Sequence, residues 1–124
     1  MTALMDAFDA GTLDPAGFTH RDHIAVAHEA LQSDEFFAAS ARVARGLRGL
    51  AAKAGAPEKY SATITLAFLS LIAERMVKAE GLSEFLAANP DLLDGSILRR
   101  LYTTARLSDP RAQRYGLLPD LAVV

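Results

Sequence analysis

Cysteine is absent from this chain of 124 residues. Without thiols the protein has no disulfide, no thiolate metal site, no iron–sulfur cluster and no cysteine nucleophile. Long apolar runs are absent as well. The most apolar stretch, residues 64–73, is interrupted by Thr65 and Ser70 and is too short to cross a membrane. The first ten residues carry two aspartates and no lysine or arginine, unlike a secretory signal. We therefore expect a cytoplasmic protein without a membrane partner.

An excess of positive charge is also missing, because the formal net charge is −2. We therefore expect no nucleic-acid partner. The charges are unevenly spread: residues 1–36 hold seven acidic side chains and one cation, and residues 99–114 hold five arginines and one aspartate. One interpretation is that the two ends pack together or neutralise each other. The other is a site for a small anionic ligand at Arg106, Arg111 or Arg114.

The hydrophobic periodicity indicates an all-α fold in a single domain, residues 1–124. No segment alternates with the period of a β-strand. We expect a compact bundle or an orthogonal packing of three long helices, with several short ones. The expected helices are Thr2 to Phe8, Thr19 to about Gln32, Ser33 to about Lys53 and a central core helix from Pro57 to about Lys78, with short helices opening at Ser83, Ser96 and Ser108–Pro110.

Two glycines interrupt the third of these helices. Gly46 and Gly49 each cost about 1 kcal/mol relative to alanine inside a helix. Close approach of a neighbouring helix would explain them. The apolar C-terminal segment, residues 117–124, is expected to pack along the body of the protein.

All three histidines fall within nine residues: His20, His23 and His28. On a helix His20 and His23 lie about 60° apart around the axis, so both rings can face one point. They are the candidate ligands for a divalent transition metal, with Asp22 and Glu29 as oxygen ligands or as groups that orient a ring. The alternative is that histidines at a helix start have no ligand role and that His28 is a hydrogen-bonded core residue.

Hydroxyl groups cluster in the segment KYSATIT, residues 59–65. Tyr60, Ser61, Thr63 and Thr65 could line a polar pocket at the start of the most apolar helix. Each hydroxyl could instead bond to the backbone carbonyl one turn earlier. The sequence has no P-loop, no dinucleotide-binding fingerprint and no G-x-S-x-G motif.

Three segments resemble a group of short bacterial proteins of unassigned function. FTHRDHI, KYSATIT and DPRAQRYGLLPDL are similar to the motifs F-x-H-x-x-H-L, K-Y-H-x-T-x-T and an ending in P-D-L, in the same order. The resemblance implies a small helical domain in which the histidine pair and a histidine of the central helix converge on one polar or metal site. It carries over to His20, His23, Tyr60, Thr63, Thr65 and Asp120. The third histidine position is Ser61 here, and a hydroxyl is a poor substitute for an imidazole ligand.

Together these patterns favour a pocket between the histidine-bearing helix and the central helix that binds a small molecule or a divalent metal. If the protein is an enzyme, which the sequence leaves open, histidine acid–base or metal-assisted chemistry is what its residues would support. The rival hypothesis is a non-enzymatic interaction protein, such as a homodimer, that binds no metal.

Overall fold

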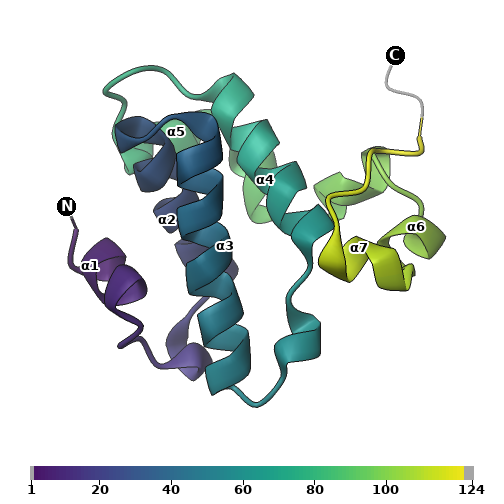
Figure 1. The fold of residues 1–124 in the computed structure, drawn as a ribbon. Helices are drawn as coiled ribbons and strands as arrows, with labels where there is room; N and C mark the ends of the chain where they lie inside the picture. Colours follow the sequence, from purple (N-terminus) through teal and green to yellow (C-terminus); the bar gives the residue numbers. More distant parts are fainter. Residues whose placement is uncertain (1, 122–124) are drawn as a thin grey trace.

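The computed structural model describes residues 2–121 and contains helices but no strand in that range (Figure 1). The all-α prediction is confirmed, and the three longest helices are the three expected ones. The α-helices are α1 (Ala3–Ala10), α2 (His20–Ser33), α3 (Phe36–Lys53), α4 (Ala62–Arg75), α5 (Leu82–Ala88), α6 (Thr104–Ser108) and α7 (Pro110–Arg114), and the 3₁₀ turns are Pro15–Gly17, Pro57–Lys59, Pro90–Leu93 and Gly95–Arg100.

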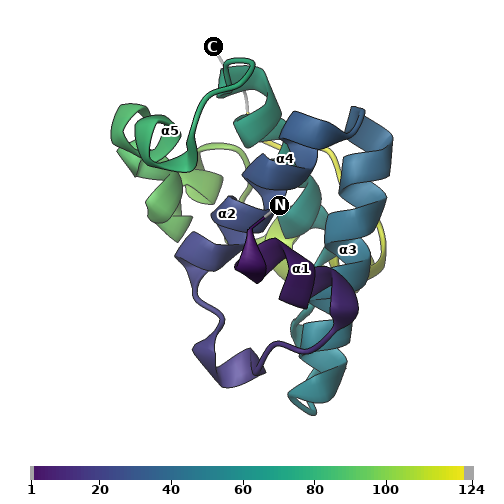
Figure 2. The same ribbon diagram turned by 90° about the vertical axis from the view of Figure 1, so that its left-hand side faces the viewer.

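Helix α2 occupies the middle of the molecule. It contacts α1, α3, α4 and α5, and six of its residues are buried, against four in α4. The prediction that the helix beginning near Pro57 is the central one is therefore wrong, although α4 contributes Leu69 and Ile72 to the same core. Helix α1 lies beside α3, whereas α6 and α7 lie beyond α4 (Figures 1 and 2).

Side-chain caps fix where the first helices begin. Thr2 caps α1, and Thr19 and Asp22 form a reciprocal capping box at α2, as predicted. Ser33 does not cap α3, because it is the last residue of α2. Glu35 accepts hydrogen bonds from the first turn of α3 instead, including one of 2.6 Å from the Ala38 amide.

Helix α4 is shorter than predicted at both ends. Pro57 opens only a 3₁₀ turn, and α4 starts at Ala62 because the Ser61 hydroxyl accepts the Ile64 amide as an N-cap. It ends at Arg75, before Lys78. The loop that follows is held by Gln32, whose amide donates to the Val77 carbonyl.

Later helix starts were only partly predicted. Asp109 caps α7 as expected, but Asp94 rather than Ser96 caps the turn Gly95–Arg100. Helix α6, which begins at Thr104 after the N-cap Thr103, was not predicted. The C-terminal segment does pack on the body as far as the structure describes it. The Tyr102 hydroxyl donates to the Leu117 carbonyl, and the Leu121 amide donates to the Leu101 carbonyl. The rest of that segment, residues 122–124, lies outside the described residues.

One hydrophobic cluster joins α1, α2, α3, α4 and α5. Its largest fully buried side chains are Phe85, Met5, Ile24, Leu69, Ile72 and Leu92. Between residues 2 and 121, no helix combines the length and the apolar character that a membrane span requires.

Candidate functional site

A pocket of about 360 Å³ lies between the start of α2, the second half of α3 and the start of α4. Its apolar walls come from all three helices and from Phe18, which precedes α2. Five of the six candidate residues for a ligand site line it: His20, His23, Tyr60, Ser61 and Thr65. The sixth, Thr63, points elsewhere. Sequence reasoning therefore brought together the polar side of the pocket, but it missed the apolar walls Phe18, Val43, Leu47, Leu50, Ala51 and Phe68.

His20 is the first residue of α2, and its ring is fixed by one hydrogen bond. Its Nε2 lies 2.9 Å from the carbonyl oxygen of Leu92. Because a carbonyl can only accept, Nε2 carries the proton, and in the neutral ring Nδ1 keeps its lone pair. His20 therefore has one nitrogen available to accept a hydrogen bond from a ligand or to bind an ion.

His23 lies one turn further along, with its ring centroid 6.2 Å from that of His20. The protein atoms packed around it lower its pKa to about 4, with the nearby charge of His20 as the second cause; Asp22 opposes the shift. The residue as a whole nevertheless remains accessible to water. At neutral pH, His23 is therefore the neutral imidazole.

Aromatic rings line this side of the pocket in a row. The Phe18 ring lies 4.8 Å from the His23 ring and is tilted by 44° against it, and His20 packs edge-on with Phe68 at 5.1 Å between ring centroids. Lys59 and Tyr60 also line the pocket, and the Arg48 guanidinium lies 5.8 Å from the centroid of the Tyr60 ring. The wall is thus aromatic, and the polar groups lie at its edge.

Three hydroxyls of the predicted cluster, those of Ser61, Thr63 and Thr65, already have partners within the chain. Ser61 donates to the Ala112 carbonyl while capping α4, and Thr65 donates to the Ser61 carbonyl at 2.8 Å. Thr63 is fully buried and joins α4 to the C-terminal segment, donating to the Tyr115 carbonyl at 2.6 Å and accepting from the Leu117 amide at 2.9 Å. Only Thr65 bonds to the carbonyl one turn earlier, as the alternative interpretation expected, whereas Ser61 and Thr63 bond to backbone carbonyls near the C-terminus.

His28 lies outside the pocket, with 4% of its surface exposed. Its ring packs at 4.8 Å from Phe85, and its Nε2 lies 3.4 Å from the side-chain nitrogen of Gln32. Burial lowers its pKa. This is the hydrogen-bonded core residue of the alternative interpretation.

The residues present do not complete a metal site. Among residues 2–121 there is no group of three or more His, Asp or Glu side chains that could hold an ion. The Asp22 carboxylate accepts a hydrogen bond from the Thr19 amide, and the Glu29 carboxylate accepts hydrogen bonds from the backbone amide and the hydroxyl of Thr2. Two imidazoles alone fall short of the three or four protein ligands usual for zinc.

The three arginines of the predicted anion site each have a partner. Arg106 donates twice to the Leu118 carbonyl, Arg111 pairs with Asp109 at 2.7 Å, and Arg114 lies over the Tyr115 ring. The pairing lowers the pKa of Asp109 to about 2. Asp120, carried over from the resemblance, accepts from the Thr103 amide and hydroxyl. These contacts account for the three arginines and for Asp120, so none of these side chains requires an anionic ligand as its partner.

The acidic and basic ends of the chain do not neutralise each other. Asp9 and Asp34 both pair with Arg42 of α3, at 2.6 and 3.4 Å. In the part of the chain that the structure describes, no ion pair joins residues 2–36 to residues 99–114. Direct ion pairing of the two ends is therefore wrong, and packing of one end on the other stays a prediction.

Comparison with protein-family models, curated proteins and solved structures gives no match for this chain.

Proposed function

We propose that the protein binds a small molecule with a flat apolar body and a polar head in the pocket between α2, α3 and α4. A volume of about 360 Å³ lies within the range of small-ligand sites. Apolar walls with a few polar groups at one edge are the usual composition of such sites. The observation that carries the proposal is the row of Phe18, His23, His20 and Phe68 along one wall.

The polar groups define the head of the ligand. His20 has a nitrogen lone pair in its neutral form, so it accepts a hydrogen bond from a hydroxyl or amine. Tyr60 and Lys59 can donate to a ligand oxygen in the pocket. A planar aromatic molecule with one hydroxyl, amine or acid group satisfies both requirements.

The test uses 1-N-phenylnaphthylamine, a neutral aromatic amine whose fluorescence rises in an apolar site. We expect one molecule to bind per chain, and Ala51→Phe, which fills the pocket from α3, to weaken binding by roughly tenfold or more. Ala41→Phe is the matched control, because Ala41 is exposed on the same helix and does not line the pocket. Circular dichroism establishes that both variants fold. Equal binding by both variants, or no binding at all, refutes the proposal.

Metal analysis of the purified protein separates this function from the metal hypothesis. If the purified protein contains stoichiometric metal, and both His20→Ala and His23→Ala lose it, the site binds a metal ion rather than an organic molecule. The homodimer hypothesis has less support in the structure. The most exposed large apolar side chains, Phe37, Val77, Tyr115 and Leu118, lie in three separate parts of the chain rather than on one element.

A further inference from the structure

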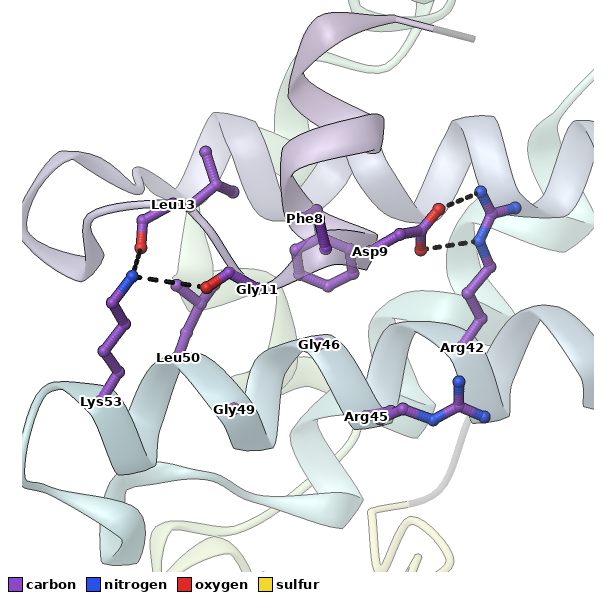
Figure 3. A pocket seen from close by; sticks show the side chains of 11 residues that line it. Phe8, Asp9, Gly11, Leu13, Arg42, Arg45, Gly46, Gly49, Leu50 and Lys53 are labelled. Carbon is purple, nitrogen blue, oxygen red and sulfur yellow. Dashed lines mark hydrogen bonds and ion pairs between the residues drawn. The ribbon is translucent and has the colours of Figure 1, made fainter.

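A second pocket, of about 520 Å³, lies between α1, the turn that follows it and α3 (Figure 3). Phe8 and Leu50 contribute apolar walls. Gly46 and Gly49 lie on the α3 side, and Arg45 and Lys53 stand toward opposite ends of that side (Figure 3). Neither the histidines nor the hydroxyl cluster takes part in this pocket.

The two glycines of α3 differ in what faces them. A Cβ at Gly46 would collide with the ring of Phe8, so this glycine lets α1 approach α3. A Cβ at Gly49 would meet nothing within 4 Å. Packing within the protein therefore does not explain Gly49, even though a glycine inside a helix costs about 1 kcal/mol relative to alanine. Gly49 leaves the floor of the pocket open.

Positive charge predominates around the pocket. Its lining contains Arg42, Arg45 and Lys53 and a single carboxylate, Asp9, which Arg42 pairs through two short hydrogen bonds. Arg45 forms no ion pair with another described residue. Lys53 donates to the Leu13 carbonyl at 2.8 Å and so ties the turn after α1 to α3. Eight residues separate Arg45 from Lys53, a rise of about 12 Å along the helix.

We propose that this pocket is a second binding site, for a small amphipathic anion. The acid group pairs with Arg45, and the apolar body lies over Gly49 between Phe8 and Leu50. Because the walls are apolar and the ends cationic, a carboxylate or phosphate on a short apolar chain complements both features, whereas a free inorganic anion complements only the charge.

The test is titration calorimetry with octanoate, octanol and inorganic phosphate. We expect octanoate to bind and each of the other two to bind at least roughly tenfold more weakly. Gly49→Leu places a side chain in the open floor and keeps a good helix former, so the variant should fold and lose octanoate binding. Arg45→Gln should weaken binding by about fivefold. Arg99→Gln, which removes an exposed arginine elsewhere, should leave it unchanged.

Each possible outcome either supports or overturns the second binding site. Octanoate binding that survives Gly49→Leu, or that Arg45→Gln and Arg99→Gln weaken equally, overturns the site. Binding that is lost only in Ala51→Phe places the anion in the histidine pocket and also overturns it. Loss in Gly49→Leu with normal 1-N-phenylnaphthylamine binding supports two independent sites, so this inference and the proposed function can fail separately.

Discussion

Thr63 shows what a single hydroxyl contributes when it both donates and accepts. It is fully buried and connects α4 to the C-terminal segment through the Tyr115 carbonyl and the Leu117 amide. The sequence marked Thr63 as a ligand-site candidate because it lies near other hydroxyls. Its partners come from residues more than fifty positions away, which no local pattern reveals.

Replacing this hydroxyl by a methyl group should be costly. Thr63→Val keeps the shape of the side chain but leaves two backbone groups without a partner, so we expect the free energy of unfolding to fall by about 1–3 kcal/mol. Urea denaturation measures the change. Thr65→Val is the control, because Thr65 makes one local bond to the Ser61 carbonyl, and its effect should stay below about 1 kcal/mol. Equal losses in the two variants would contradict the bridging role of Thr63.

At the scale of one helix, α3 separates the two pockets. Leu50 lines both of them, and the arginine-rich and glycine-bearing face of α3 is turned toward α1. The sequence suggested that a neighbouring helix approaches the glycines. The structure confirms this for Gly46, where the neighbour is Phe8, and not for Gly49.

The same substitution at these two glycines should have opposite effects. Gly46→Ala forces the buried Phe8 ring to move and should lower the free energy of unfolding by about 1–3 kcal/mol. Gly49→Ala meets open space and should raise it by about 1 kcal/mol, through the better helix propensity of alanine. Thermal melting of the two variants and of the parent protein shows whether each substitution raises or lowers the stability. If both variants are stabilised, α1 does not pack on Gly46 as described.

At the scale of the whole molecule, a helix start could be predicted where the sequence offers only one suitable N-cap nearby, and not where it offers several. Thr19 and Asp22 form the capping box that the sequence indicated, and α2 begins where expected. Ser33 and Pro57 were predicted as helix starts, but the caps are Glu35 and Ser61, which lie within four residues of them. Helical spacing placed His20 and His23 on one side of a pocket. Its other walls depend on how α3 is rotated against α2, which periodicity alone does not determine.

The cavity between α1 and α3 could not be predicted for a related reason. A cavity is space that packing leaves unfilled, and no residue pattern encodes it directly. The glycines and cations of α3 were visible in the sequence, but only the position of α1 brings them to a common opening.

The histidines should make the stability of the protein depend on pH within one defined range. The pKa of His23 falls from 6.5 to about 4, and that of His28 is also lowered, so the unfolded chain binds more protons than the folded one between these values. Stability is therefore full above pH 6.5 and declines as the pH falls toward 4. The carboxylates whose pKa values are lowered, such as Asp9, contribute their stability above 3.8 and lose it only below that value.

Melting temperatures between pH 7.5 and 4.5 test this coupling. His23→Gln removes one of the two rings whose pKa is lowered, so its melting temperature should fall less steeply with acid than that of the parent, and the remaining slope should come from His28. The melting temperature of the parent should therefore fall relative to that of the variant as the pH drops, because the parent alone loses the contribution of His23. Parallel curves across this range would mean that His23 has the same pKa folded and unfolded, which would place its ring in bulk solvent rather than in the pocket beside Phe18.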